Sequence, residues 1–291
     1  MKLRGKKATE ILGQVVLWII LIASLLIFSV PFLFMITNSF EEFSYVLPYP
    51  PKIFPTRLDF SAYQHILGMD IFPTALKNSV INTVITVVIS VFVSTLSAYG
   101  FARIRFPGRD KLFAVYMFTL MVPGFLNIIP QFLVLRRLAL PGLPNGLIGT
   151  RVGLILVYVA TNVCGHTFFL RNFFRSLPNS LAESVLLDGG GHKDIFFRVM
   201  LPLSAPAVGT MTIFAFQGFW EEYFTAKVLV GANEKMITFP LLLQRLNGQY
   251  ATRWEWVFAA SILALIPVIV LFVIFQRKTV VGGLTQGAVK G

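Results

Sequence analysis

Long stretches without charge limit what this chain can fold into more than any other feature. Residues 11–40 contain no Asp, Glu, Lys or Arg. A helix needs about 20 apolar residues to cross a bilayer, and this run is longer. Five further apolar stretches follow, at 77–103, 112–135, 152–170, 199–220 and 256–276. The sequence therefore predicts an all-α integral membrane protein with six transmembrane helices.

The composition agrees with this class and argues against others. Hydrophobic residues make up 56% of the 291 residues and charged residues only 13%, whereas soluble domains average about 25% charged. The net charge of +12 would indicate nucleic-acid binding in a soluble protein, but here the basic residues flank apolar stretches, as in membrane proteins. One cysteine and three histidines leave no internal disulfide and no usual zinc site. We therefore expect neither nucleic acid nor a metal as a ligand.

The distribution of basic residues predicts that both termini are cytoplasmic. Residues 1–10 form a basic cytoplasmic tail, and residues 11–76 hold the first transmembrane helix and an external loop. This first apolar stretch is too long for a cleaved signal peptide, so we expect it to remain as an anchor. A five-helix core is expected at 77–276, with a cytoplasmic loop at 171–205, and a cytoplasmic tail at 277–291.

Prolines and small polar residues predict details of two of these helices. Pro123 and Pro130 should kink the third apolar stretch, which is tolerated where neighbouring helices satisfy the freed backbone groups. Ser90, Ser94 and Thr95 in the second stretch are small enough to let helices approach closely.

The loop at 171–205 contains a short amphipathic helix, expected at 181–188. Ser180 and Glu183 fit an S-x-x-E capping box, and the glycines at 189–191 end the helix. An apolar arc is formed by Leu181, Ala182, Val185 and Leu186, while the other side carries Glu183, Ser184, Asp188 and Leu187. A helix of two turns is not stable alone in water, so we expect it to dock into another surface. The alternative to a docked helix is an amphipathic helix that only covers the surface between two membrane spans.

Catalytic motifs are missing from the sequence. Neither Gly-rich stretch, at 189–194 or 282–287, has the spacing of a nucleotide-binding P-loop. No nucleophile-and-base pair occurs at suitable spacing, and no charged residue lies at the middle of a span, which argues against a proton-coupled transporter. A metal cluster could be imagined from four residues of the loop, Glu183, Asp188, His192 and Asp194. These side chains are better explained as ordinary hydrogen-bond acceptors around the glycine turn at the end of a helix.

Neutral polar residues inside the spans form a possible path for a solute. Tyr158, Asn162 and His166 are spaced by four and so share one face of the fourth helix. Further candidates lie on the third and fifth helices: Asn127, Gln131 and Gln217. Neutral hydrogen-bonding groups suit a sugar, but hydrogen bonds between packed helices would use the same residues. Both interpretations stay open at this point.

The loop around the short helix resembles a known family. Glu183, then Asp188-Gly189, and later Leu201-Pro202 look like the "EAA" loop of ABC-importer permease subunits, roughly E-A-A-x-x-D-G-A followed by L-P. In that family the loop carries a coupling helix that docks into a cleft on the ATP-hydrolysing subunit. This chain departs at Ser184-Val185, in place of two alanines, and at Gly190, in place of the third. The resemblance implies these coupling residues: Glu183, Ser184, Val185, Leu187, Asp188, Gly189, Leu201 and Pro202.

Other segments resemble the carbohydrate branch of this family, at 76–79, 98–103, 106–109, 173–178 and 283–291. The last of these is the most specific, because it is similar to the tail of the second membrane subunit of maltose-type importers, where the tail extends along the ATPase pair. At 220–223 the chain departs from the family, which more often has Asn after the Trp.

The resemblance implies the type I ABC-importer permease architecture, in the plasma (inner) membrane of a bacterium or archaeon. The chain would form half of the path for an oligosaccharide or related carbohydrate. The implied partners are a second homologous permease subunit, two copies of an ABC ATPase subunit, an extracytoplasmic solute-binding protein and membrane lipid. ATP and Mg would be bound by the ATPase subunits, and this chain would bind no cofactor.

Two other classes of function are compatible with parts of the sequence. A stand-alone channel or secondary carrier needs only the six spans, whereas the loop and the tail favour the importer subunit. A membrane enzyme is favoured least, since catalytic residues are missing.

Overall fold

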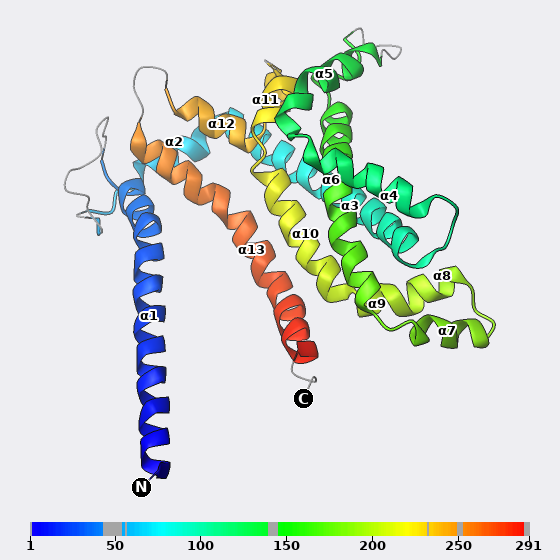
Figure 1. Ribbon diagram of the computed structural model, residues 1–291. Coiled ribbons are helices and arrows are strands. Elements are labelled where there is room, and N and C mark those ends of the chain that lie inside the picture. The colour runs from blue at the N-terminus through cyan, green and yellow to red at the C-terminus, as the bar shows by residue number, and fades with distance from the viewer. Residues whose placement is uncertain are drawn as a thin grey trace. The chain divides into compact units, whose positions relative to one another are not determined.

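The computed structural model describes residues 2–42, 54–55, 57–138, 145–231, 233–248 and 253–287, and the side chains of residues 11–274 within these ranges. All regular structure in these residues is helical (Figure 1), which confirms the predicted class. Contacts divide the chain into two units, which are Met1–Met69 with Leu243–Ala264, and Asp70–Leu242 with Leu265–Gly291. The last four residues of the 283–291 segment lie outside the described residues.

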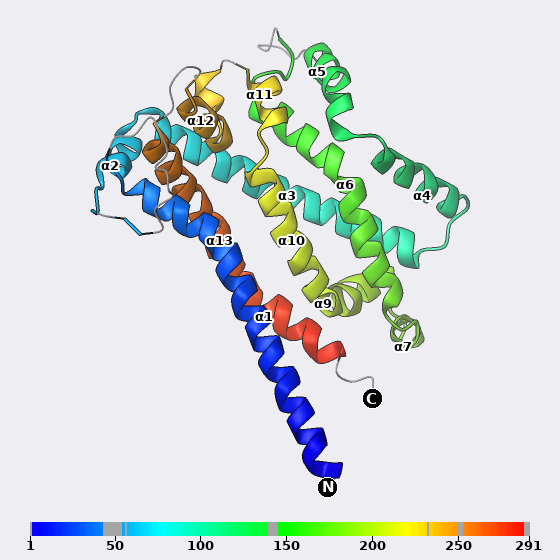
Figure 2. The same ribbon diagram turned by 60° about the vertical axis from the view of Figure 1, so that its left-hand side comes forward.

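The first unit contains α1 (Lys2–Ser39), α2 (Ser61–Gly68), the end of α12 (Phe239–Leu246) and the first part of α13 (Trp254–Gly287). The Ser39 hydroxyl lies 2.8 Å from the hydroxyl of Tyr63, which places α2 beside the end of α1 (Figure 2). Phe34 meets Phe258 of α13 edge to face, with 5.8 Å between ring centroids. The large apolar side chains at 11–33 are exposed in the isolated chain, as expected for a helix that faces lipid or another subunit.

The second unit contains the other elements. They are α3 (Ile71–Arg103), α4 (Arg109–Phe118), η1 (Thr119–Met121), η2 (Gly124–Asn127), α5 (Ile128–Arg137), α6 (Arg151–Ser176), α7 (Ser180–Leu187), α8 (His192–Asp194), the π-helix η3 (Ile195–Met200), α9 (Leu201–Leu203), α10 (Ala205–Trp220), α11 (Phe224–Val230), η4 (Glu234–Met236) and α12 (Phe239–Leu246). The final residues of α12 belong to the first unit, and the later part of α13 to the second.

Four helical stretches in the described residues are long and apolar enough to span a membrane: Ile11–Ser39, Ile71–Arg103, Arg151–Ser176 and Trp254–Ile274. The predicted third and fifth spans are each broken into two helices. Arg109–Met121 and Gly124–Arg137 meet at 93°, and His192–Leu203 and Ala205–Trp220 meet at 72°. The total is six if each bent pair is one span, which agrees with the prediction.

Both bends lie beside prolines. Val122 has an extended backbone with ψ of 118°, because the ring of Pro123 disfavours the helical conformation in the residue before it. Ser204 marks the second bend between Pro202 and Pro206, neither of which has an N–H to donate within the helix.

α3, α6 and α10 pack against one another in the second unit. Ser90, Ser94 and Thr95 of α3 are buried, as predicted for small polar residues at a close helix contact. The Ser94 hydroxyl donates to the backbone carbonyl of Val163 on α6, at 3.4 Å. The two serines therefore help to hold α3 and α6 together.

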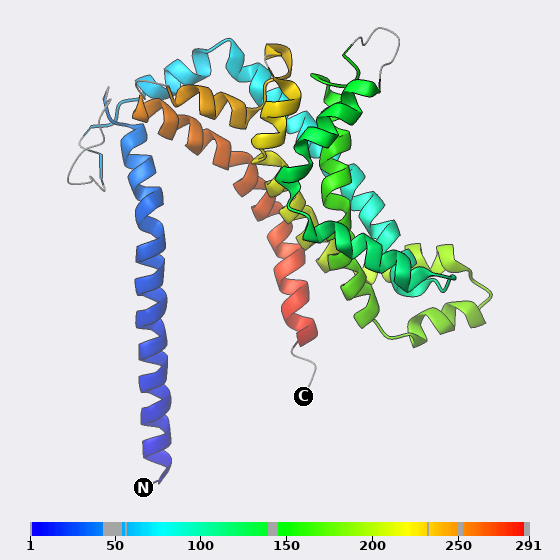
Figure 3. The same cartoon turned by 45° about the horizontal axis from the view of Figure 1, so that its top comes forward.

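A buried cluster gathers where α3 and α6 end and α10 begins. We call it the core cluster; it consists of Ala98, Tyr99, Leu170, Phe174, Ile195, Phe196, Met200, Ala207 and Met211. Figures 1 and 3 show α7, α8 and α9 grouped beyond this end of α6, while α5 and α11 lie toward its other end. The predicted coupling loop is thus built onto a packed base.

Candidate functional site

The short helix α7 starts at Ser180, one residue earlier than predicted, with Asn179 as its N-cap. The Asn179 carbonyl accepts the backbone N–H groups of Ala182 and Glu183, at 2.9 and 3.1 Å. The predicted capping box is wrong, because Ser180 is already the first helical residue and Glu183 lies one position too late to reach back. The Asn179 side chain does not cap the helix but accepts a hydrogen bond from Arg103.

α7 ends at the predicted glycine turn. Gly189 has φ of +79°, in the left-handed region that residues with a Cβ rarely adopt. Gly190 then folds back on the helix, since its N–H donates to the Val185 carbonyl at 2.9 Å. A Cβ at position 190 would lie 2.6 Å from Cγ1 of Val185. Only glycine fits at 190 while valine occupies 185.

The two sides of α7 have different surroundings. Ala182 and Val185 are partly buried against the core cluster. Leu187 is 88% exposed and Leu186 is 52% exposed, so Leu186 does not share the covered side with Val185. The polar coupling residues are also exposed: Glu183, Ser184 and Asp188. α7 is therefore fixed on one side and presents leucines and acidic groups on the other.

The chain continues from the glycine turn toward α10 through α8. The Asp194 carboxylate accepts the backbone N–H of Gly191 at 3.1 Å and pairs with Arg198 at 3.3 Å. These contacts begin the return helix. In the described part of the chain, no three His, Cys, Asp or Glu side chains are placed to hold a metal ion.

The predicted Leu201-Pro202 pair follows a π-helical turn, Ile195–Met200. Pro202 has no N–H to offer the Arg198 carbonyl and its ring displaces that carbonyl, which gives a physical reason for the wider turn before it. Leu201 packs against the core cluster, and Pro202 is exposed. The two motif residues thus join the loop to its buried base.

Arg103, the last residue of α3, connects three elements. Its Nη2 donates to the carbonyls of Phe174 at 2.5 Å and Leu177 at 2.6 Å, and its Nη1 donates to Oδ1 of Asn179. Carbonyls at the end of a helix lack partners within the helix, and a guanidinium satisfies several of them at once. Arg103 therefore ties the start of α7 to the ends of α3 and α6.

Tyr99, one turn before Arg103 on α3, contacts the return stretch. Its hydroxyl donates to the His192 carbonyl at 3.3 Å, and its ring lies 5.0 Å from that of Phe196. α3 thus holds both ends of the predicted coupling loop.

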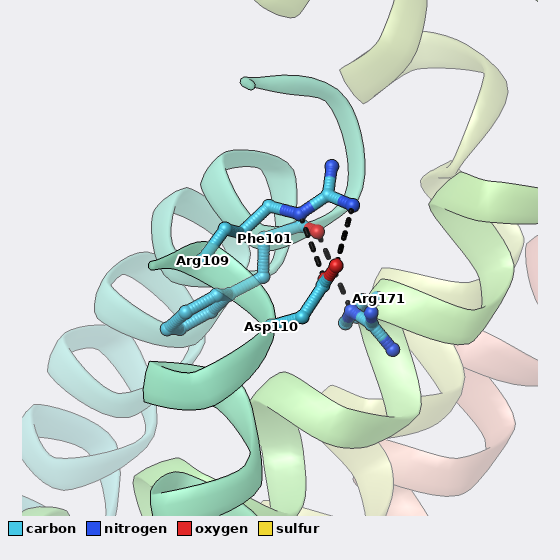
Figure 4. Close-up of polar contacts among 4 residues, drawn as sticks. All are labelled: Phe101, Arg109, Asp110 and Arg171. Atoms are coloured by element: carbon cyan, nitrogen blue, oxygen red, sulfur yellow. Dashed lines mark hydrogen bonds and ion pairs between the residues drawn. The ribbon is translucent and has the colours of Figure 1, made fainter. Parts of the chain in front are cut away.

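A second set of charged residues lies between the start of α4 and α6 (Figure 4). Nε of Arg109 donates to Oδ1 of Asp110 at 3.0 Å. Arg171 donates from Nε to the Phe101 carbonyl at 3.4 Å, and its guanidinium lies 3.7 Å from the ring centroid of Phe113. These contacts fix α4 to α3 and α6 beside the loop.

Tyr158, the first residue of the predicted polar stripe, is only 3% exposed. Its hydroxyl donates to Oε2 of Glu222 at 2.7 Å. The Glu222 carboxylate also accepts the backbone N–H groups of Thr225 and Ala226 at the start of α11. The departure from the family pattern at 220–223 therefore has a structural account, since Glu222 ties α6 to α11.

Asn162 and His166 continue the stripe with free polar atoms. Nδ1 of His166 lies 2.8 Å from the Ser90 hydroxyl, and its ring meets Phe219 of α10 edge to face. Asn162 is exposed and donates from Nδ2 to the Tyr158 carbonyl at 2.9 Å. Among the described residues, neither Oδ1 of Asn162 nor Nε2 of His166 has a hydrogen-bond partner.

The remaining path candidates lie apart from the stripe. Asn127 and Gln131 are partly buried at the junction of η2 and α5. Gln217 is exposed on α10, with its Nε2 3.4 Å from Oε1 of Glu221. No hydrogen bond between described residues joins these three to the α6 stripe.

Several residues that organise the site were not predicted to belong to it: Ser90, Tyr99, Arg103 and Glu222. Tyr99 and Arg103 carry a usable signal, because a spacing of four at the end of an uncharged span places both on one helix face. Glu222 carries none, since its partner Tyr158 lies 64 residues away in the chain.

Comparison with known proteins assigns a family to this arrangement. Residues 90–279 match the family described as binding-protein-dependent transport system inner membrane component. The chain is 32% identical over 259 residues to the diacetylchitobiose uptake system permease protein NgcG of Streptomyces coelicolor, which covers 89% of this chain and 83% of that protein. It is also 32% identical over 242 residues to the trehalose transport system permease protein SugB of Mycobacterium tuberculosis, with coverages of 82% and 85%.

The fold gives the same result. A crystal structure of a bacterial ABC transporter involved in the import of the acidic polysaccharide alginate is similar with a TM-score of 0.72 and 27% identity, over 94% of this chain and 97% of that chain. The resemblance inferred from the loop is thereby confirmed. The chain belongs to the binding-protein-dependent transport system inner membrane components, and it is a non-catalytic permease subunit of an ABC importer.

Proposed function

We propose that the chain forms one half of the translocation path of an ATP-driven carbohydrate importer. The family description names a binding protein, and the similar proteins are named for uptake of diacetylchitobiose, trehalose and alginate. The partners in this proposal are a second homologous permease subunit, two copies of an ABC ATPase subunit and an extracytoplasmic solute-binding protein. ATP and Mg are bound by the ATPase subunits.

α7 is the coupling helix in this proposal. A coupling helix has to be attached firmly to its own subunit and exposed to its partner. Arg103 and the side chains of Ala182 and Val185 provide the attachment, and the 88% exposed Leu187 beside Glu183 provides the free side. This two-sided arrangement is the observation that carries the proposal. When the ATPase subunits close, α7 moves and carries the ends of α3 and α6 with it.

The sugar path is proposed to pass the exposed part of the α6 stripe. Asn162 and His166 keep free polar atoms, and such groups favour a water-filled cavity or a solute over lipid. Tyr158 supports the path from behind through Glu222. Asn127, Gln131 and Gln217 remain further candidates on the neighbouring helices.

The proposed orientation follows from the position of α7. If α7 meets an ATPase, the loop at 171–205 faces the cytoplasm, as do residues 1–10 and the tail at 277–291. The segment at 41–76 is then external. The family description supports the plasma (inner) membrane of a bacterium or archaeon as the location.

Co-purification tests the coupling role. We expect Leu187→Arg to lose the ATPase subunits during purification in detergent while keeping the second permease subunit. Leu58→Arg changes another exposed leucine (61%), in the segment expected outside, and it should keep both partners. A stand-alone channel or carrier would purify without ATPase in every case. Retention of the ATPase and full uptake in Leu187→Arg would contradict the assignment of α7.

A further inference from the structure

A cleft of about 490 Å3 opens beside α7, between the last turns of α3 and α6 and the start of α4. Four arginines line the cleft, namely Arg103, Arg105, Arg109 and Arg175. Glu183 is the one carboxylate among the lining residues. A concave surface with this excess of positive charge raises the local concentration of anions. The cleft is therefore a candidate anion site.

The four arginines are not equivalent. Arg103 is committed to the carbonyls at the end of α6, and Arg109 pairs with Asp110 (Figure 4). Arg105 and Arg175 are exposed, and neither forms a hydrogen bond or ion pair with another described residue. Two guanidinium groups in the cleft are thus free to bind a phosphate, for which their forked geometry is well suited.

The surface next to the cleft is apolar. α4 begins at Arg109, and its side chains Leu112, Val115 and Phe118 are exposed at intervals of three residues. Arg109–Met121 is also half of one of the two bent apolar pairs that qualify as a membrane span. We therefore expect lipid hydrocarbon around this helix. Its first residue, Arg109, lies at the boundary between the apolar surface and the charged cleft.

We propose that the cleft binds the phosphate of an anionic phospholipid whose acyl chains lie along α4. Arg105 and Arg175 contact the phosphate, and Tyr99 and Asn179 line the same cavity with neutral polar groups. Basic pockets between membrane helices bind anionic head groups through the same chemistry. The adjoining apolar face favours a lipid over a soluble phosphate or an acidic protein segment.

Native mass spectrometry of the purified complex tests the site. Phosphatidylglycerol, phosphatidylcholine and free glycerol phosphate are titrated as probes against the wild type and the double variant Arg105→Gln/Arg175→Gln. At about 1 kcal/mol for each basic residue near an anionic lipid, the double variant should bind phosphatidylglycerol roughly 30-fold more weakly. Its binding of phosphatidylcholine should not change. Arg136→Gln/Arg137→Gln removes two other exposed arginines, at the end of α5, and should leave both affinities unaltered.

Three results would overturn the assignment. Wild-type affinity for phosphatidylglycerol in the double variant would show that the cleft holds no lipid phosphate. Equal affinity of the wild type for glycerol phosphate and phosphatidylglycerol would identify a soluble phosphate site. Loss of the ATPase subunits from the double variant, with unchanged lipid binding, would identify a protein contact. A second variant, Val115→Gln, should weaken long-chain phosphatidylglycerol more than the dihexanoyl form, and equal effects would contradict the position of the chains.

Discussion

Val185 and Gly190 fit together across the end of α7, where a Cβ at position 190 would lie 2.6 Å from Cγ1 of Val185. The family pattern that the loop resembles has alanine at both positions. This chain has a larger residue at 185 and a smaller one at 190, so we expect the two differences to compensate each other in volume.

A double-mutant cycle tests this compensation. Gly190→Ala should destabilise the loop by about 1 to 3 kcal/mol through overpacking, seen as faster proteolysis at 186–194 and reduced uptake. Val185→Ala/Gly190→Ala should recover most of the loss, because the closest contact, with Cγ1 of Val185, is then removed and the carbonyl oxygen of residue 185 at 3.0 Å is the nearest atom left. Additive losses in the double variant would show that the two positions are independent.

Arg103 should be irreplaceable by lysine, although both are positively charged. A lysine ammonium cannot hold two carbonyls and the Asn179 amide in the same geometry, and one hydrogen bond to a charged group contributes about 1.5 to 3 kcal/mol. We expect Arg103→Lys to speed hydrogen exchange in α7 at least tenfold, measured by mass spectrometry on the assembled complex.

Arg105→Lys is the matched control, because Arg105 is exposed and forms no hydrogen bond with the described residues. Its exchange should equal that of the wild type. Unchanged exchange in Arg103→Lys would mean that α7 is held by its apolar side alone.

The features that the sequence predicts well are local or periodic. Uncharged length locates the spans, proline predicts the bend in the third span, and the need for positive φ identifies Gly189 as the end of α7. Small polar residues at 90 and 94 mark the close contact of α3 with α6, because small side chains let two helix backbones approach each other.

The features that it misses depend on partners far away in the chain. Asn179 rather than Ser180 is the N-cap of α7, and its side chain accepts a hydrogen bond from Arg103 of α3. The sequence also does not reveal that the Tyr158 hydroxyl donates to Glu222. Neither choice is visible in the periodicity of a single helix, because each is decided by tertiary packing.

Asn162 should contribute to transport without supporting the fold. It is exposed on α6 and its Oδ1 has no partner among the described residues, so a lost hydrogen bond to a sugar would cost about 0.5 to 1.5 kcal/mol. Asn162→Ala should therefore weaken uptake roughly three- to tenfold, measured with labelled sugar in proteoliposomes. Leu156→Ala, a 48% exposed site on the same helix, should have little effect. If Asn162→Ala breaks up the complex while the intact fraction transports normally, the residue serves helix packing.

Photo-cross-linking at position 187 tests the coupling role of α7 most directly. Leu187 is replaced by p-benzoylphenylalanine in the assembled complex in membrane vesicles, and Leu58 is replaced in the same way as the control. We predict that illumination joins position 187 to an ATPase subunit, that ATP changes the yield, and that position 58 gives no ATPase product. An intact, ATP-hydrolysing complex in which position 187 cross-links only to lipid or to its own chain would contradict this account.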